Sequence, residues 1–247
     1  MLLRGKNAVI TGARTGIGRA IVERFAQEGA NIWAVVHRED VEWLSAMDTL
    51  ATGCGVWIKP VYIDLSDEGQ IKQGMQSIIK EKMPIDVLVN AAGVLSPKRL
   101  FTMTSLADIR QLMEVNFFAA VQLSQLASRA MMRQKSGSIV HISSVSAWAE
   151  DSAQLEYAVS KAAINCATKK MAAELGAYGI RVNAVAPGLI ETKMLAEANE
   201  DAVEQLKNGT YMKHIGKPEN VASMVAYLAN DEANYVTGQI IRVDGGM

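Results

Sequence analysis

Residues 7–18 read NAVITGARTGIG, and this stretch carries the pattern that decides the fold. A short β-branched run ends at Thr11, and a turn rich in glycine, with Gly12, Gly16 and Gly18, leads directly into a helix-like segment. Glycine permits tight turns, and a helix N-terminus offers free amides and the positive end of its dipole to an anion. The stretch therefore predicts a strand, a pyrophosphate-binding turn and a helix; the alternative is a turn that needs glycine for steric reasons alone.

Outward from this stretch, short β-branched runs alternate with longer segments that have the period of an amphipathic helix. The runs at 8–10, 32–36 and 87–89 are continuously apolar, which is typical of parallel strands covered on both faces. The seven predicted strands are residues 7–11, 31–36, 56–63, 85–90, 138–143, 181–186 and 239–243.

The predicted helices carry apolar residues on one side, as helices that cover a sheet must. The first begins near Ile17 and ends at Gly29, and a later one opens at Ser105 with Asp108 at a capping-box spacing. Strands and helices alternate to the end of the chain without a linker, which predicts a single α/β domain over residues 1–247 with a doubly wound parallel sheet. The other predicted helices are residues 67–82, 156–178 and 218–230.

The least regular stretch, residues 188–216, follows the sixth strand at the carboxyl edge of the sheet, where open α/β folds bind ligands. We predict that this stretch is a mobile lid over a substrate. An ordinary pair of surface helices is the alternative.

The composition indicates which class of partner the protein binds. The 247 residues carry 25 basic and 26 acidic side chains, for a formal net charge of -1. No positive charge is left over for a nucleic acid or an anionic membrane surface, so we expect a small-molecule partner. The chain has neither a signal-peptide pattern nor an apolar run of about 18 residues that would span a bilayer. Cys54 and Cys166 fit no disulfide framework or zinc pattern, and we expect both to be small buried residues in a cytoplasmic protein.

The three histidines, His37, His141 and His214, lie on different segments without the spacing of metal ligands. No metal site is therefore predicted. His141 lies within the fifth predicted strand and is expected to pack in the core rather than bind a ligand.

Tyr157 and Lys161 are four residues apart in the helix predicted over residues 156–178, so they share one helix face. A nearby ammonium favours the phenolate and lowers the pKa of a tyrosine, which is about 10 when unperturbed. The pair therefore predicts an acid/base catalyst. A surface tyrosine beside a solvated lysine is the alternative.

With these motifs the chain resembles the short-chain dehydrogenase/reductase family over nearly all of its length. The resemblance implies a Rossmann-type sheet of seven strands in the order 3-2-1-4-5-6-7, and an enzyme that transfers a hydride between nicotinamide and a carbonyl or secondary alcohol. The motifs that carry it stand in the family's order: residues 11–18, Asn90-Ala91-Ala92-Gly93, Asn116, Ser144, Tyr157-xxx-Lys161 and Pro187-Gly188.

The resemblance also implies a role for each catalytic residue. Tyr157 exchanges a proton with the carbonyl or alcohol oxygen, and Ser144 orients that oxygen. Lys161 holds the nicotinamide ribose and tunes Tyr157, while Asn116 supports a water in the proton relay. Ser143 competes for the serine role, but the family's interval of thirteen residues to the tyrosine selects Ser144.

The cofactor contacts follow from the same resemblance. The glycine turn takes the pyrophosphate, and Asp64 and Leu65 take the adenine, although Asp64 also fits a plain strand-end turn. The full set of expected cofactor-binding residues is Gly12, Arg14, Thr15, Gly16, Ile17, Gly18, His37, Arg38, Asp64, Leu65, Asn90, Ala91, Gly93, Tyr157, Lys161, Pro187, Gly188, Ile190 and Thr192.

The choice of dinucleotide depends on the end of the second strand, where NAD enzymes present an acid to the ribose 2′-hydroxyl. Here Val35-Val36-His37-Arg38 lacks that acid, and Arg14 stands in the glycine turn, so a 2′-phosphate would meet one or two guanidiniums. We predict NADP(H). NAD(H) is the alternative, because Glu39 and Asp40 follow directly and Arg38 also fits a solvated strand end.

The closing segments resemble bacterial 3-oxoacyl-acyl-carrier-protein reductases in particular, and Gln154 is expected to touch the substrate with Ser144 and Tyr157. Two basic positions that these reductases use to hold their acidic partner are Lys135 and Tyr178 here, so only one keeps its charge. The segments concerned are GLIETKM at 188–194, GKPENVA at 216–222, VTGQ at 236–239 and DGGM at 244–247.

The first expected substrate is therefore an acyl-carrier-protein thioester, with a sugar, polyol or other secondary alcohol as the alternative. A non-catalytic dinucleotide-binding regulator on the same fold is a more distant alternative. The family also implies a homotetramer formed through residues 105–134, residues 156–178 and the last strand.

Overall fold

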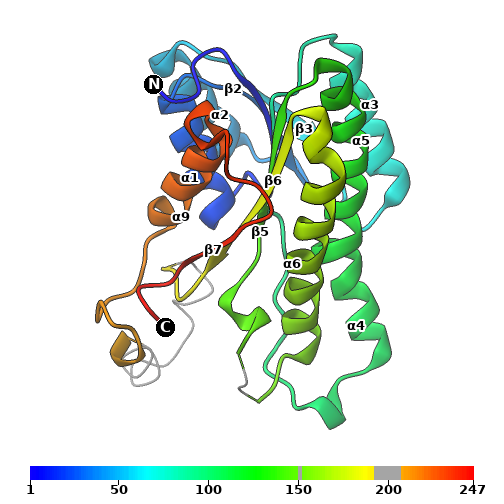
Figure 1. The fold of residues 1–247 in the computed structure, drawn as a ribbon, viewed down its shortest axis with the longest axis vertical. Coiled ribbons are helices and arrows are strands. Elements are labelled where there is room, and N and C mark those ends of the chain that lie inside the picture. Colours follow the sequence, from blue (N-terminus) through cyan, green and yellow to red (C-terminus); the bar gives the residue numbers. More distant parts are fainter. Residues whose placement is uncertain (150–151, 192–206) are drawn as a thin grey trace.

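The computed structural model describes residues 1–149, 152–191 and 207–247. Within them, parallel strands form one sheet in the order β3-β2-β1-β4-β5-β6-β7 (Figure 1), which confirms the order expected from the sequence. The order reverses between β1 and β4, the switch point at which doubly wound sheets bind ligands. The strands are β1 (Asn7–Thr11), β2 (Asn31–Val36), β3 (Ile58–Tyr62), β4 (Val87–Asn90), β5 (Gly137–Ile142), β6 (Ile180–Pro187) and β7 (Ile240–Val243).

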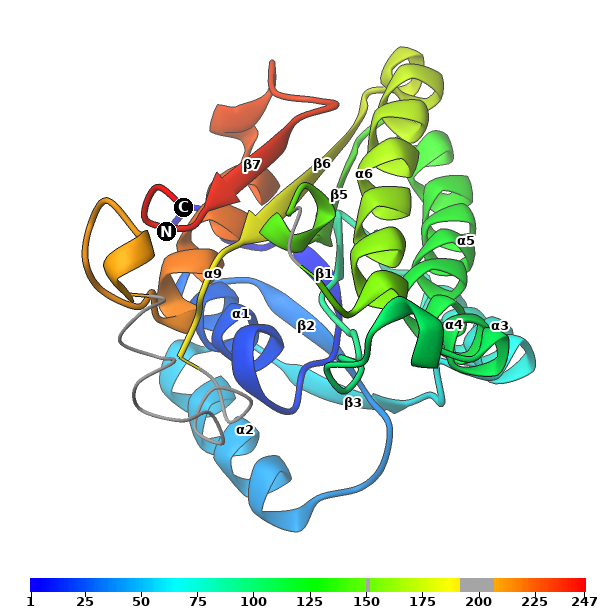
Figure 2. The ribbon, with the colours of Figure 1, turned by 90° about the horizontal axis from the view of Figure 1, so that it is seen from below.

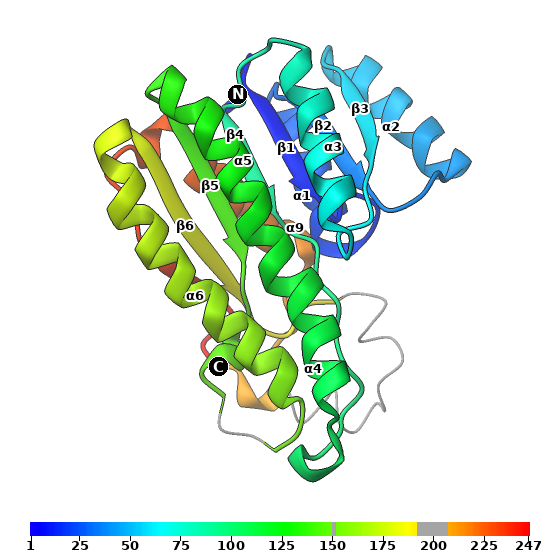
Figure 3. The ribbon, with the colours of Figure 1, turned by 90° about the vertical axis from the view of Figure 1, so that its right-hand side faces the viewer.

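Helices cover both faces of this sheet. The described α-helices are α1 (Gly16–Gln27), α2 (Val41–Cys54), α3 (Glu68–Lys80), α4 (Leu106–Met113), α5 (Ala119–Gln134), α6 (Leu155–Leu175) and α9 (Pro218–Ala229). Figure 3 shows α3, α5 and α6 in front of the sheet, with α1, α2 and α9 behind it. The result is the three-layered α/β arrangement expected from the alternation of strands and helices.

Alternate side chains of β1 enter two separate cores. Ala8 and Ile10 pack in the core that includes Phe25 of α1, while Val9 packs in the core that includes Met75 of α3. Because strand side chains alternate between the faces, a strand covered on both sides is apolar at every position. This explains why the apolar runs in the sequence show no alternation.

Local sequence signals identified most helices, and α2 is the exception. The predicted capping box of Ser105 and Asp108 is present at the start of α4. No helix was predicted over residues 41–54, where Trp43 and Met47 of α2 are buried and the partly buried Leu44 and Leu50 pack against the same core. Asp40 nevertheless starts this helix, because its carboxylate accepts a hydrogen bond from the Trp43 amide.

The expected burial of the cysteines is wrong, whereas that of His141 is confirmed. Cys166 is exposed on α6 and Cys54 is half-buried at the end of α2, and both are free thiols. His141 is completely buried in β5. No helix in the described ranges is long and apolar enough to cross a membrane.

Because all strands of the sheet are parallel, the segments that follow them meet at one edge. These are the turn after β1 and the loops after β2, β4, β5 and β6, all at the lower edge in Figure 1, toward which Figure 2 looks. Most of the predicted site residues that the structure describes lie on these segments, on the loop after β3 and at the starts of α1 and α6, and Asn116 lies in η2 (Glu114–Phe118). The fold therefore gathers most of them at the carboxyl edge.

Candidate active site

The glycine turn between β1 and α1 lies against the loop that follows β4. Gly12 has a φ of +66°, and a Cβ at this position would lie 2.9 Å from the backbone of Ala92. A Cβ on Gly18 would collide with the carbonyl oxygen of Gly12. Both positions therefore require glycine for the turn to close this tightly.

The start of α1 is suited to bind an anion. Thr15 is its N-cap but makes no capping side-chain hydrogen bond within the described part of the chain, and the first turn holds no acidic residue. The first amides of α1 and the positive end of its dipole thus face the turn without a compensating protein carboxylate. Together with the guanidinium of Arg14, this donor set fits the phosphates of a dinucleotide.

Thr11 ties this turn to the loop after β4, a role that the sequence analysis did not assign to it. Its Oγ1 accepts hydrogen bonds from the amides of Ala91 and Ala92, both at 3.0 Å. The contact fixes the Asn90-Ala91-Ala92-Gly93 segment beside the glycine turn. The feature of the sequence that could have indicated this role is a hydroxyl at the last position of β1, directly before Gly12.

Ser144, Tyr157 and Lys161 come together where the end of β5 meets the start of α6. Ser144 caps η3 (Val145–Ala147), the short 3₁₀ turn that follows β5. Its side chain is hydrogen-bonded to the Tyr157 hydroxyl. The Nζ atom of Lys161 lies 5.6 Å from the centroid of the Tyr157 ring and donates to the Ile142 carbonyl oxygen at 2.9 Å.

Ser143 points away from this group. Its buried hydroxyl donates to the carbonyl oxygen of Lys161 at 3.4 Å, and its amide donates to the Val185 carbonyl oxygen at 2.7 Å. Of the two adjacent serines, Ser144 is therefore the one beside Tyr157.

Burial controls the protonation of Tyr157 and Lys161. It raises the pKa of Tyr157, and the hydrogen bond with Ser144 acts in the opposite direction. It lowers the pKa of Lys161 from 10.5 to about 8. From the sequence we expected Lys161 to lower the Tyr157 pKa. In the structure desolvation is the larger effect on that pKa, because both groups are withdrawn from water.

Asn116 lies in a π-helical segment, η2 (Glu114–Phe118), between α4 and α5. Its Oδ1 accepts from the Val94 amide at 2.8 Å, and its Nδ2 donates to the Val94 carbonyl oxygen at 2.9 Å. A Cβ on the neighbouring Gly93 would lie 3.4 Å from both the Asn116 Oδ1 and the Lys161 Nζ. Asn116 thus holds the loop after β4 close to Lys161, and single-turn π segments of this kind are common at functional sites.

Arg14 lies next to the end of β2, as expected, but it has an acidic partner. Its Nη1 lies 3.2 Å from Oδ2 of Asp40, the residue that caps α2. The Trp43 amide and then Arg14 hold the pKa of Asp40 below its usual range. His37 and Arg38, which precede Asp40 in the chain, are exposed. From the sequence Asp40 was expected only as an acid near Arg38, and its contact with Arg14 was not predicted.

Asp64 forms the turn after β3. Its Oδ1 accepts from the amide and hydroxyl of Ser66, at 2.9 and 2.7 Å, and lies 3.9 Å from His37 Nδ1. The Ser66 hydrogen bonds are the main cause of the lowered pKa of Asp64. This geometry matches the strand-end turn that was the alternative reading of Asp64, and the half-buried Leu65 packs against the core beside it.

The side chain of Asn90 faces the interior of the molecule. Its Nδ2 lies 3.1 Å from Ser124 Oγ and 3.2 Å from His141 Nδ1. Burial, with a smaller contribution from Lys161, lowers the pKa of His141 to about 4, so the imidazole is neutral near pH 7. Asn90 therefore joins β4, α5 and β5, and leaves only its main chain at the edge of the sheet.

The two ends of the predicted lid are joined. Ile190 forms an isolated parallel bridge with Gly216, in which the Glu191 amide donates to the Gly216 carbonyl oxygen at 2.8 Å. The Gly188 amide, just after Pro187, donates to the Val243 carbonyl oxygen at 3.0 Å. The middle of the predicted lid, with Thr192, lies outside the described residues.

Gln154 stands directly before α6 with a φ of 56°. Its side-chain nitrogen donates to the Ser96 carbonyl oxygen at 2.7 Å, and its amide donates to the Arg99 carbonyl oxygen at 3.2 Å. Gln154 thus joins the start of α6 to the loop after β4, three residues before Tyr157 in the chain.

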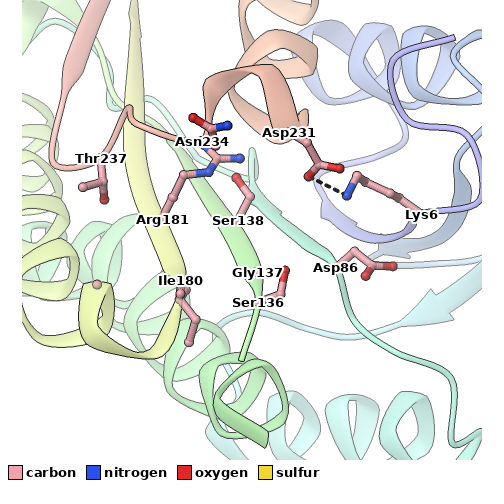
Figure 4. A pocket seen from close by; sticks show the side chains of 13 residues that line it. Lys6, Asp86, Ser136, Gly137, Ser138, Ile180, Arg181, Asp231, Asn234 and Thr237 are labelled. Carbon is pink, nitrogen blue, oxygen red and sulfur yellow. Dashed lines mark hydrogen bonds and ion pairs between the residues drawn. The ribbon is translucent and has the colours of Figure 1, made fainter. Parts of the chain in front are cut away.

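A cavity of about 250 Å³ lies at the opposite, amino edge of the sheet (Figure 4). It is lined by residues that precede strands, including Lys6, Asp86 and Ser136, and Lys6 forms an ion pair with Asp231 at 2.9 Å. Because Ser144 and Tyr157 lie at the carboxyl edge, this cavity is not part of the predicted site.

Known protein sequences are similar to this chain over almost all of its length. A family model described as Enoyl-(Acyl carrier protein) reductase matches residues 12–247. The 3-oxoacyl-[acyl-carrier-protein] reductase FabG of Thermotoga maritima is 39% identical over 248 residues, covering 100% of this chain and 99% of that protein. The protein of the same name from Aquifex aeolicus is 36% identical, covering 99% and 98%.

Solved structures resemble the whole chain as well. A protein from Agrobacterium tumefaciens assigned as a gluconate dehydrogenase has a TM-score of 0.94 at 30% identity, covering 99% of this chain and 96% of that one. A variant short-chain dehydrogenase/reductase from Serratia marcescens has a TM-score of 0.91 at 34% identity, covering 100% and 99%. A Beutenbergia cavernae protein assigned as an NAD(P)-dependent gluconate 5-dehydrogenase, with bound NADP, has a TM-score of 0.92 at 33% identity, covering 98% and 96%.

Proposed function

Since this chain belongs to the short-chain dehydrogenase/reductase family and is an NAD(P)-dependent oxidoreductase, we propose that it reduces the ketone of 3-oxoacyl thioesters with NADPH. The observation that carries the proposal is the convergence of Ser144, Tyr157 and Lys161 beside a glycine turn suited to phosphates. The presence of all three side chains also favours an enzyme over a non-catalytic dinucleotide-binding regulator.

Tyr157 is the proposed acid. Burial raises its pKa, so the phenol holds its proton at neutral pH and can deliver it to the carbonyl oxygen of a ketone. When bound, the reduced nicotinamide supplies the hydride that adds to the carbonyl carbon. The product is a secondary alcohol, and Tyr157 is left as the phenolate. In the reverse direction the phenolate accepts the proton of the alcohol.

Ser144 and Lys161 support that transfer. The Ser144 hydroxyl donates to the substrate oxygen and polarises the carbonyl group. The ammonium of Lys161, with a pKa of about 8, is a buried proton source near Tyr157 and would hold the ribose hydroxyls of the cofactor. Asn116 positions the loop at Val94 and supports a water through which Tyr157 recovers a proton.

NADP(H) is the proposed cofactor. The turn residues Gly12, Thr15, Gly16, Ile17 and Gly18 would hold the pyrophosphate at the start of α1. Arg14 and the exposed His37 and Arg38 would face a 2′-phosphate, since no carboxylate takes the place of that phosphate in residues 35–38. Asp64 and Leu65 would lie near the adenine, and the main chain of residues 90–93 near the ribose. Pro187, Gly188 and Ile190 would face the carboxamide, together with Thr192, which lies outside the described residues.

An apolar substrate chain fits the surroundings of the predicted site. Val94 and Leu95, which follow the loop held by Asn116, and Trp148, which follows η3, are 45%, 37% and 50% exposed. The names of the curated relatives give further support to an acyl thioester. A carrier-protein partner has weaker support, because Tyr178 offers no charge beside Lys135. Oxidation of a sugar acid is the second candidate, favoured by the two similar structures assigned as gluconate dehydrogenases.

We also propose that residues 1–247 form a single domain with a substrate lid at about 188–216, and that four copies assemble. The bridge between Ile190 and Gly216 supports the lid, because it holds both ends of that stretch together at the carboxyl edge. A cytoplasmic location stays a prediction from the sequence.

A substrate panel tests the proposed function. Initial rates are measured with NADPH and NADH on 3-oxoacyl, 2-enoyl and keto-sugar-acid substrates. We expect 3-oxoacyl thioesters with NADPH to be turned over fastest. Tyr157→Phe is expected to lower kcat by roughly 10²- to 10⁴-fold while the Kd for NADPH stays similar. Faster turnover of the enoyl or sugar-acid substrates, or full activity of Tyr157→Phe, would contradict the proposal.

A further inference from the structure

The hydroxyl of Ser144 makes two hydrogen-bond contacts with one nearby residue, Ser146, in the η3 turn. The Ser146 amide donates to Ser144 Oγ at 3.1 Å, and the two hydroxyl oxygens are also 3.1 Å apart. The third neighbour of Ser144 Oγ is the hydroxyl of Tyr157. Among the described residues, Ser144 is the hydrogen-bond partner of the Ser146 hydroxyl.

A serine hydroxyl has one hydrogen and two lone pairs, so these neighbours limit what Ser144 can do. The Ser146 amide can only donate, and it therefore occupies one lone pair of Ser144. If the Ser146 hydroxyl also donates, both lone pairs are filled, and the single hydrogen of Ser144 is left for Tyr157 or a substrate oxygen. If Ser144 instead donates to Ser146, its hydrogen is turned away from the reacting group.

We propose that Ser146 is a positioning residue that fixes the direction of the Ser144 hydroxyl. This inference rests on the proposed function, in which Ser144 donates to the substrate oxygen. In the productive arrangement the Ser146 hydroxyl donates to Ser144, and Ser144 donates to the carbonyl oxygen. A hydroxyl that accepts a hydrogen bond is a stronger donor, so the short chain from Ser146 to the substrate also strengthens the polarisation of the carbonyl.

Before the substrate binds, the single hydrogen of Ser144 can instead be donated to Tyr157. That hydrogen bond stabilises the phenolate, and it opposes the effect of burial on the Tyr157 pKa. Loss of the Ser146 hydroxyl weakens this donor. The pH limb of kcat/KM for alcohol oxidation, which reports Tyr157 in the free enzyme, should therefore move to higher pH when the Ser146 hydroxyl is removed.

The test compares Ser146→Ala, Ser146→Thr and Ser144→Ala with the double variant that carries both alanines. We expect Ser146→Ala to lower kcat for ketone reduction by roughly tenfold, with KM and the NADPH Kd within about twofold. Its oxidation profile should move to higher pH. Ser146→Thr keeps the hydroxyl and should retain kcat within about threefold and the original pH profile.

The double variant separates a positioning role from a structural one. If Ser146 acts through Ser144, its alanine substitution should cost nothing further once Ser144 is alanine. The inference would be overturned if Ser146→Ala lowered kcat equally in the unmodified protein and in the Ser144→Ala variant. It would also be overturned if Ser146→Ala left kcat and the pH profile unchanged. If Ser146→Ala does not fold, failure of Ser146→Thr to keep kcat and the pH profile would overturn it. A Ser144→Ala variant with full activity would instead reject the proposed function itself.

Discussion

Lys161 carries a charge that the fold buries almost completely. Its side chain is 4% exposed and its pKa falls from 10.5 to about 8 because of desolvation. An unfolded chain keeps the proton up to pH 10.5, whereas the folded protein keeps it only to about pH 8. Between these values the unfolded state binds more protons, so the stability of the protein rises with pH. Below pH 8 Lys161 is charged in both states, and burying this charge lowers the free energy of unfolding by the full amount, roughly 3 kcal/mol.

Lys161→Met is therefore expected to abolish turnover and yet stabilise the cofactor-free protein. The gain at pH 7 should be about 2 kcal/mol, since the loss of the hydrogen bond to the Ile142 carbonyl oxygen offsets part of the removed penalty. Denaturant unfolding from pH 7 to 10 measures the free energy of unfolding of both proteins. Their difference should shrink as pH rises from 8 towards 10.5. A variant that is less stable at pH 7, or a difference independent of pH, would argue against a buried ammonium.

At the scale of elements, two helices start with the same kind of cap but differ in the side chains that contact it. Asp40 caps α2 by accepting from the Trp43 amide, and Asp67 caps α3 by accepting from the Gln70 amide, both at 3.0 Å. Only Asp40 also pairs with Arg14 of the glycine turn. The Asp40 cap thus lies in the region where a 2′-phosphate would bind, while the Asp67 cap does not contact Arg14.

Asp40→Asn is expected to increase the preference for NADPH over NADH by about threefold. Asparagine caps a helix as well as aspartate does, so the free energy of unfolding should not change measurably. Removing the carboxylate leaves the charge of Arg14 uncompensated toward a 2′-phosphate. Asp67→Asn is the matched control and should change neither quantity. Titration with both dinucleotides gives the Kd values, and a weaker relative affinity for NADPH would mean that Asp40 is needed to orient Arg14.

At the scale of the whole molecule, one group of exposed apolar side chains lies around the start of α4. Phe101, Met103 and Leu106, in η1 (Phe101–Met103) and at the start of α4, are 72%, 70% and 66% exposed. Exposed apolar groups this close together are typical of surfaces that become covered by another chain. They lie at or next to the segment 105–134 through which the family resemblance implies a homotetramer.

If the proposed tetramer forms through this surface, Leu106→Glu is expected to split it into smaller species. A carboxylate at the first position of α4 suits the helix dipole, so the fold should be retained while burial against another copy becomes unfavourable. Light scattering compares the measured mass with multiples of the 26.7 kDa chain. Val41→Glu is the control, because Val41 is 75% exposed at the start of α2. An unmodified protein that is monomeric would refute the assembly.

The sequence alone determined the strands, their parallel arrangement and the order of the motifs, because each depends on local features. The apolar run at β1, the glycines after it and the interval from Tyr157 to Lys161 are set by the backbone and its periods. The helix α2 was missed, although Trp43, Met47 and Leu50 recur at helical spacing and pack against one core.

Only the tertiary structure decided how the site residues act on one another. The raised pKa of Tyr157, the pairing of Arg14 with Asp40 and the direction of Ser143 toward α6 depend on burial and on contacts between separate segments. Desolvation has no local sequence signature, so the expected effect of Lys161 on Tyr157 could be corrected only after the chain was folded. The sequence thus determined which groups are present and in what order, while packing decided their charge and their partners.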